Sequence, residues 1–250
     1  MRVSTIDDCL KLQTDFDSFS IWSSPLGLLL NPSECQVFTF GKIKSPFKFP
    51  YSLGENNIPR VSDYVTDLGF KLSCYLDPSY HINYVCCKAF KSLGFVMRLS
   101  KDFQFDISIK TLYCALVRPI LEYGSVVWDP HTANDSRHLE RVQHRFLRFA
   151  CRILHIPCHS HDYSPVANVL GLSSLAERRH TAGIRFIDGL LNGKVESSAI
   201  LSLICFKVPQ RSTRSTTPFY VPHSTTNYIA NEPLRRLMSN ANADTNFTFC

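Results

Sequence analysis

A run of arginines between residues 137 and 152 has the clearest chemical meaning in this sequence. The arginines recur every three or four residues, which places them along one side of an α-helix: Arg137, Arg141, Arg145, Arg148 and Arg152. Each guanidinium can form two parallel hydrogen bonds with anionic oxygens, so such a row matches the phosphates of a nucleic-acid backbone. A solvated helix face, with Arg137 paired to Glu140, explains the same spacing. The pattern leaves both interpretations open.

A group of cysteines and histidines follows directly: Cys151, His155, Cys158 and His161. Zinc prefers four nitrogen and sulfur ligands, which two close cysteine–histidine pairs could supply. However, the spacing matches none of the usual zinc pairings, Pro157 interrupts it, and His159 would compete as a ligand. The prediction is a structural role, with a metal site as the alternative.

An adjacent acidic pair, Asp7 and Asp8, could be taken for the carboxylate pair of a metal-dependent polymerase. Ser4 and Thr5 precede it at the spacing of a helix capping box, and a helical apolar pattern follows. We therefore predict that these carboxylates cap a helix. No nucleophile can be assigned, and the phosphate-binding patterns GxxxxGK(S/T) and GxGxxG are both absent from the sequence.

Helices must position the arginine row, and the apolar spacing predicts several of them. Asp77-Pro78 is a helix start signal, and a long amphipathic pattern follows it to about Leu99. A capping box at Ser174 and Glu177 begins another helix. The remaining helical patterns lie at 107–121, from Ser136 to 150, and around 233–238.

The first part of the chain combines one helix with short strands. The helical pattern ends at Pro25 and Gly27. Alternating apolar residues predict strands at 36–40, 48–53 and 65–72. The predicted fold class is therefore α+β: a small antiparallel sheet with one helix, followed by a mainly helical bundle. The predicted domains are residues 1–76, residues 77–206, and an extended basic and polar arm with a short helix at 207–250.

Charge and cysteine content narrow the function classes. The net charge is +6, but residues 1–79 carry seven Lys/Arg against nine Asp/Glu, whereas residues 80–250 carry twenty against twelve. This asymmetry favours a polyanionic partner for the second part. The sequence shows no signal-peptide pattern and no apolar run of about 18 residues. Several of the ten cysteines lie in helical apolar patterns, so we expect an intracellular, reduced protein with no membrane contact.

Several stretches resemble the C-terminal part of reverse transcriptases from jockey-like non-LTR retrotransposons. The most specific block spans Thr111 to Trp128 and contains RPILEYGSVVW, followed by LERVQHRFLR at 139–148. Further similar stretches lie at 8–16, 34–40 and 67–70, although Glu34 replaces the usual lysine. The resemblance extends over about residues 3–240.

The resemblance implies the last part of a palm, a thumb and a C-terminal region. In that family an aromatic-Ala-Asp-Asp motif lies upstream of the position of Met1, so no catalytic residue can be carried over, and bound magnesium would belong to that missing part. The implied function is binding to the backbone of RNA, DNA or an RNA–DNA hybrid without sequence specificity, with no catalysis and no cofactor in this chain. A further expected partner is the missing polymerase part. Further arginines could extend the track: Arg178, Arg179, Arg185, Arg211 and Arg214.

Two alternatives remain at this point. The chain could be a folded relic whose helices only pack together, with no role in nucleic-acid binding. A metal-assisted enzyme built on the cysteine–histidine group is the other alternative. The resemblance also predicts that the first 75 residues are less stable than residues 78–192, because strands that lack their neighbours keep unpaired edges.

Overall fold

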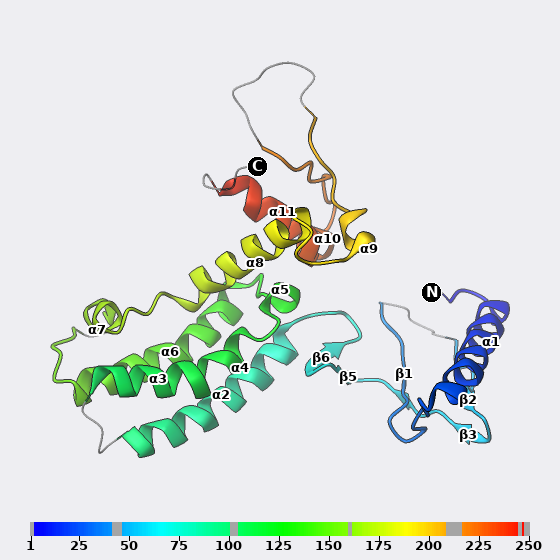
Figure 1. Cartoon of the computed structure of the whole chain (residues 1–250), viewed down its shortest axis with the longest axis horizontal. Helices are drawn as coiled ribbons and strands as arrows, with labels where there is room; N and C mark the ends of the chain where they lie inside the picture. The colour runs from blue at the N-terminus through cyan, green and yellow to red at the C-terminus, as the bar shows by residue number, and fades with distance from the viewer. Residues whose placement is uncertain are drawn as a thin grey trace. The chain divides into compact units, whose positions relative to one another are not determined.

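The fold is described from a computed structural model, which covers residues 3–41, 47–100, 105–159, 162–208, 217–244 and 247 (Figure 1). Helices and short strands are both present, so the predicted α+β class is confirmed. The chain divides into two units, residues 1–81 and 82–250, and we describe each by itself. Within the ranges given above, no helix has the length and apolar character needed to cross a bilayer.

Unit 1 begins with helix α1 (Ile6–Ser23), whose first turn confirms the predicted capping role. The backbone N–H groups of Ser4 and Thr5 both donate to Asp8 Oδ2 at 2.9 Å, and Asp8 N–H donates to Thr5 Oγ1 at 3.2 Å. The bond from the Ser4 backbone, followed by those from Thr5, lowers the pKa of the Asp8 carboxyl. A short 3₁₀ turn, η1 (Ser24–Leu26), follows, and Gly27 closes it with a φ of +74°.

The strands of unit 1 form three separate pairs instead of one continuous sheet among the described residues. Strand β1 (Val37–Phe38) pairs in parallel with β4 (Arg60–Val61), and β2 (Ser52–Leu53) pairs antiparallel with β3 (Asn56–Asn57). Strands β5 (Tyr64–Asp67) and β6 (Phe70–Ser73) form an antiparallel hairpin.

The prediction of one strand over residues 65–72 is wrong. Leu68 and Gly69 have φ values of +46° and +84°, so the chain reverses there. Positive φ at both central residues is the geometry of a type I′ hairpin turn, which matches the right-handed twist of the flanking strands. Leucine seldom adopts this conformation, which is why the sequence did not indicate a turn.

The interior of unit 1 is small. The side chain of Gln13 on α1 holds β2 through two hydrogen bonds to the backbone of Ser52, at 2.9 and 3.0 Å. Large apolar residues of α1 remain exposed, including Ile21 at 74% and Trp22 at 61%. Among the residues of unit 1 that the structure describes, the buried hydrophobic ones are Cys9, Tyr51 and Leu53. Little apolar surface is therefore removed from water in this unit.

His81 is a buried titratable side chain of unit 1. It lies in the first turn of α2 (Ser79–Leu99), is 2% exposed, and its Nδ1 accepts a hydrogen bond of 3.2 Å from the backbone N–H of Lys71. Its ring centre is 5.6 Å from that of Phe70. Burial, and then the positive charge of Lys71, lower the pKa of the imidazole below 6.5.

Acidification is expected to destabilise unit 1 through His81. The folded unit keeps the imidazole neutral, whereas the unfolded chain binds a proton as the pH falls through 6.5. The free energy of unfolding therefore decreases as the pH is lowered from above 6.5 towards the folded pKa. Hydrogen-exchange protection of the β5–β6 amides at about pH 7.5 and about pH 5.5 would measure this. An equal loss in a His81→Phe variant, which cannot titrate there, would contradict the prediction.

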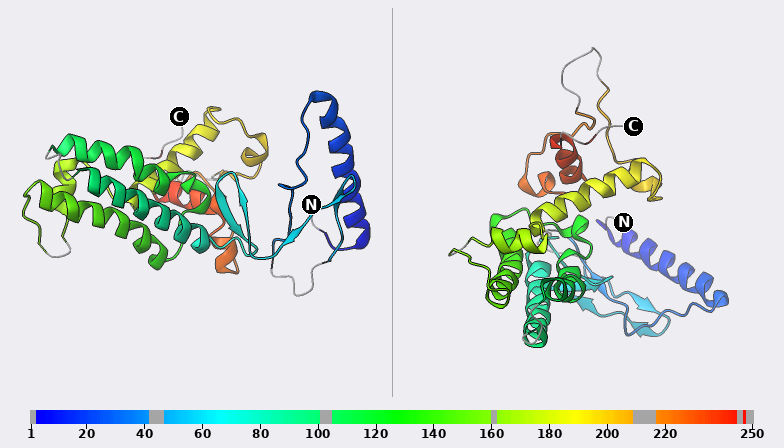
Figure 2. Two further views of the ribbon diagram at one scale, coloured as in Figure 1. Left: turned by 90° about the horizontal axis from the view of Figure 1, so that it is seen from below. Right: turned by 60° about the vertical axis from the view of Figure 1, so that its left-hand side comes forward.

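Unit 2 is helical, and α2, α3 and α6 run side by side in it (Figures 1 and 2).

Two predicted helix boundaries in unit 2 need correction. The helix predicted over 107–121 is divided, because Pro119 lies in the first turn of a new helix and cannot donate the hydrogen bond that would continue the old one. The arginine-bearing helix begins before Ser136, where Thr132 caps it by accepting from Asp135 N–H at 3.1 Å. The helices that follow α2 are α3 (Asp106–Leu116), α4 (Arg118–Glu122), α5 (Ser125–Trp128), α6 (Ala133–Ile153), α7 (Ser164–Leu170), α8 (Leu175–Leu191), α9 (Ser198–Leu201), α10 (Asn227–Ala230) and α11 (Pro233–Ala243).

A buried contact between α3 and α6 fixes the orientation of α6. The rings of Tyr113 and Phe146 stack with centres 4.1 Å apart. The hydroxyl of Tyr113 donates to Gln143 Oε1 at 3.0 Å, and Gln143 Nε2 donates to Ser173 O at 2.8 Å. All three side chains are buried, so a rotation of α6 would break a satisfied polar network as well as the ring contact.

The short helix predicted around 233–238 is present within α11, which packs against α8. The segment from residue 217 that precedes it is held against α11 and is not an extended arm. Phe219 is buried, and Asn242 on α11 hydrogen-bonds both its backbone N–H and its carbonyl, at 3.0 and 2.9 Å. Gly183 permits the close approach of α11, because a Cβ there would be 2.7 Å from Leu237 Cδ2. These contacts complete an apolar cluster with Ile187, Leu190, Met238 and Ala241.

Candidate nucleic-acid interface

Helix α6 presents the predicted arginines on its solvent side. Its opposite side is fully buried and carries Leu139, Val142, Phe146 and Ala150. At 3.6 residues per turn and 1.5 Å per residue, the arginines occupy an arc of about 80° over about 22 Å of helix. All five are exposed, and we call them the arginine row: Arg137, Arg141, Arg145, Arg148 and Arg152.

The arginine row forms few contacts within the protein. Arg148 Nε donates to the Tyr163 hydroxyl at 3.2 Å, and the Arg145 guanidinium lies 5.7 Å from the centre of the Phe90 ring on α2. Arg137 and Arg152 each donate Nε–H to the backbone carbonyl of the residue one turn earlier in α6. A guanidinium has five N–H groups, so most donors of the row face solvent.

No carboxylate neutralises the arginine row within the described ranges. Asp135 is buried and accepts the hydroxyl hydrogen bond of the cap residue Thr132 at 2.6 Å. Glu140 Oε1 accepts the backbone N–H of Ala176, in the first turn of α8, at 2.8 Å. The Arg137–Glu140 pair of the solvated-face alternative is not among the ion pairs of this part of the chain. In the part of the chain that the structure describes, none of the five guanidiniums of the row therefore forms an ion pair.

Arg178 and Arg179 do not belong to this interface, which corrects the prediction. Arg178 on α8 forms a two-bond ion pair with Glu122, and this pairing raises the pKa of its guanidinium. Arg179 is only 5% exposed and donates to Asp129 Oδ1 at 2.8 Å. Both guanidiniums are used to hold α8 against the segment around α4 and α5, so neither is free for a phosphate.

The other proposed extensions differ in their placement. Arg185 is exposed on α8, on a different helix from the arginine row. Arg211 and Arg214 lie outside the residues that the structure describes.

The structure describes three of the four members of the cysteine–histidine group that was kept as an alternative metal site: Cys151, His155 and Cys158. Cys151 and Cys158 are paired as a disulfide, a pairing that the prediction of reduced cysteines did not include, and in this state their sulfurs are not thiolate ligands. His155 is exposed, and His161 lies outside the described residues. Over the ranges with described structure, no three His, Cys, Asp or Glu side chains are grouped in a way that could hold a metal ion.

Comparison with known proteins identifies no relative that could help to interpret this surface. No family model, curated protein or solved structure matches the chain. The α6 surface must therefore be interpreted from its own chemistry.

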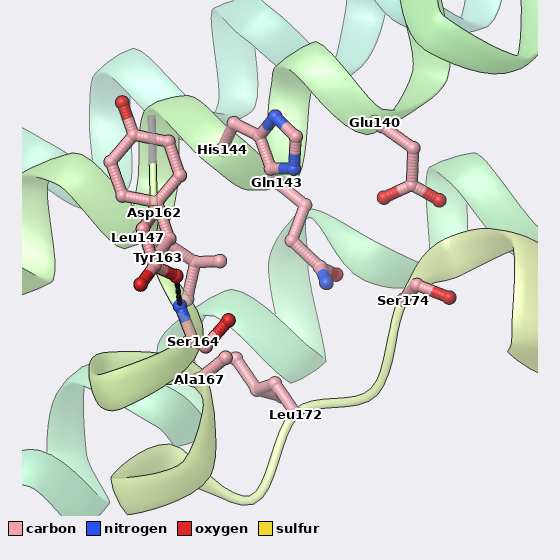
Figure 3. Close-up of a pocket in the computed structure, with 10 residues that line it drawn as sticks. All are labelled: Glu140, Gln143, His144, Leu147, Asp162, Tyr163, Ser164, Ala167, Leu172 and Ser174. Carbon is pink, nitrogen blue, oxygen red and sulfur yellow. Dashed lines mark hydrogen bonds between the residues drawn. The ribbon is translucent and has the colours of Figure 1, made fainter. Parts of the chain in front are cut away.

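A pocket of about 240 Å³ borders the arginine row, between α6, α7 and the segment that leads into α8 (Figure 3). Glu140, Gln143 and His144 reach it from α6, and Tyr163 precedes α7. The ring centres of His144 and Tyr163 are 5.4 Å apart. Because Arg148 also binds the Tyr163 hydroxyl, the pocket and the arginine row are connected.

Two aromatic residues of this surface could not be found by sequence reasoning. Phe90 lies 55 positions before Arg145 on another helix, and Tyr163 follows a segment with no helical pattern. Their contacts with the row depend on how separate helices pack, which periodicity within one helix does not report.

Proposed function

We propose that unit 2 binds the sugar–phosphate backbone of RNA, DNA or an RNA–DNA hybrid through the arginine row on α6, without sequence specificity and without catalysis by this chain. The observation that carries the proposal is a row of five exposed arginines with no acidic partner in the described ranges. A thumb-like role, and an origin in a jockey-like reverse transcriptase, rest on the resemblance of residues 111–128 and 139–148.

The physical support is electrostatic and geometric. Successive arginines are about 4.5–6 Å apart along the helix axis, and the buried contacts of Phe146 and Gln143 keep them on one side. Guanidiniums are weakly hydrated and form forked hydrogen bonds with phosphate oxygens, so a fixed row of them matches a polyanion. Contacts with phosphates position a nucleic acid and carry no sequence information.

Binding is expected to weaken steeply with salt. If all five arginines neutralise phosphates of a duplex, the logarithm of the binding constant should fall with the logarithm of salt concentration with a slope of about −4.5. Removing two of them in Arg141→Ala with Arg145→Ala should reduce this slope to about −2.7. Fluorescence anisotropy with a labelled RNA–DNA hybrid across a salt series measures both values.

The matched control removes two positive charges from unit 2 outside α6, in Lys194→Ala with Lys207→Ala. Both lysines are exposed. A general charge effect would lower binding equally in the two double variants, whereas the proposal expects the larger loss of affinity and slope from the α6 variant. A folded wild-type chain that binds nothing at low salt would instead support the alternative of a helical protein with no nucleic-acid role.

A further inference from the structure

The pocket beside the arginine row is lined by negatively charged groups, which disfavour a phosphate, but its side chains can bind a nucleobase. Two carboxylates line it, Glu140 and Asp162, and both would repel an anion. Asp162 Oδ1 already accepts the backbone N–H of Ser164 at 3.0 Å, and Glu140 uses Oε1 for Ala176. The second oxygen of Glu140 remains to accept an N–H group, as carboxylates do from the exocyclic amines of bases.

The pocket also offers aromatic surface. Figure 3 shows the rings of His144 and Tyr163 at one side, with Ala167 and Leu172 at the apolar floor. A volume of about 240 Å³ is below the about 300–1,000 Å³ typical of pockets for drug-sized ligands, so it suits one planar ring system and not a whole nucleotide. Every base has a π face, and a base that stacks on an aromatic side chain gains affinity with little sequence preference.

Arg148 connects the two parts of this surface. It belongs to the arginine row and donates to the Tyr163 hydroxyl at 3.2 Å. A strand whose phosphates follow the row would therefore carry its bases past the mouth of the pocket. A paired base could not enter, because its ring is stacked and its hydrogen-bonding edge is occupied within the helix.

We infer that unit 2 binds single-stranded nucleic acid, with phosphates on the arginine row and one unpaired base in the pocket against Tyr163 and His144. This inference rests on the proposed function and names its ligand class. Tyr163 is the main stacking residue, and Glu140 Oε2 accepts an N–H of the base. A continuous duplex binds through the arginine row alone.

The test compares three probes of equal length by fluorescence anisotropy: a single-stranded RNA, the same RNA annealed to complementary DNA, and a sugar–phosphate strand without bases. Wild-type protein should prefer the RNA over the strand without bases by about 5- to 150-fold, which corresponds to the stacking of one base on an aromatic side chain. Tyr163→Ala should remove this preference, and it should lower binding of the RNA by more than it changes binding of the hybrid, to which Tyr163 contributes only through its bond with Arg148. Tyr163→Phe keeps the ring and should preserve the preference.

Tyr220→Ala is the matched control, since Tyr220 is an exposed tyrosine of unit 2 that does not line the pocket. If Tyr163→Ala leaves the preference for RNA intact, or if wild-type protein binds the strand without bases as tightly as RNA, the pocket is not a base site. If wild-type protein binds none of the three probes, the proposed function itself fails. The comparison of probes on wild-type protein does not depend on the folding of any variant.

Discussion

Asp129→Ala is expected to cost unit 2 about 3–5 kcal/mol of stability, because it leaves the buried guanidinium of Arg179 and the partly buried guanidinium of Arg236 without a counter-charge. Arg179 Nε lies 2.8 Å from Asp129 Oδ1, and Arg236 Nε lies 3.6 Å from Oδ2. The side chain of Arg179 is 2% exposed and that of Arg236 is 14% exposed. Burial already lowers the pKa of Arg236, and Asp129 opposes that shift. A thermal transition should fall by roughly 6–20 °C.

The control for this variant is Glu122→Ala. Glu122 pairs with Arg118 and Arg178, whose side chains are 25% and 35% exposed, so solvent can replace the lost carboxylate. We expect a loss of about 1 kcal/mol or less. Adding Arg179→Met to Asp129→Ala should recover part of the loss, because one of the stranded charges is then removed. Equal losses in Asp129→Ala and Glu122→Ala would show that the site is not effectively buried.

Hydrogen exchange is expected to be at least about 100-fold faster in α1 than in α6, which corresponds to about 2.7 kcal/mol less protection. The two helices have similar lengths, 18 and 21 residues, so length does not explain the difference. Helix α1 buries Cys9 and Ser23, whereas α6 buries a continuous side that includes Leu139, Val142 and Phe146. An isolated helix of this length is marginal in water, so packing decides its stability.

Mass-spectrometric exchange on the intact chain measures this difference. Peptides from α2 provide an internal reference, because α2 buries Val85, Leu93 and Val96 within unit 2. Protection in α1 equal to that in α6 would contradict the prediction and would mean that the exposed Ile21 and Trp22 are covered in solution. Addition of single-stranded RNA should leave exchange in α1 unchanged, since the proposed interface lies entirely in unit 2.

Helices with strong local signals were predictable from the sequence. Three of these signals depend only on residues that are close in the sequence, and the structure contains all three: the Thr5–Asp8 capping box, the Ser174 cap and the long apolar pattern of α2. The misses occurred where a local preference is overridden or ambiguous. Leu68 adopts a conformation that leucine avoids. Pro119 falls near the end of the helix predicted over 107–121, although proline is equally typical of the first turn of a helix, where the structure has it.

The candidate site was predictable only in its periodic part. The five arginines of α6 share a side because 3.6-residue spacing requires it. Arg178 and Arg179 have the same residue type and a plausible position, but their roles depend on Glu122 and Asp129, which lie about 50 residues earlier and reach them only through tertiary packing. The Cys151–Cys158 bond likewise depends on how the chain turns after α6, which the spacing did not reveal.

Because α11 packs on α8, the apolar cluster between them can form only after α11 has been synthesised. Leu190 leaves the ribosome 47 residues before Leu237, the residue that fills the space above Gly183. At a synthesis rate of about 5–20 residues per second, the apolar side of α8 remains uncovered for roughly 2–10 s before α11 has been synthesised. During that interval the nascent chain exposes Ile187 and Leu190 and offers a binding site for a chaperone. A ribosome stalled between these two points would hold a chain whose helical unit cannot close.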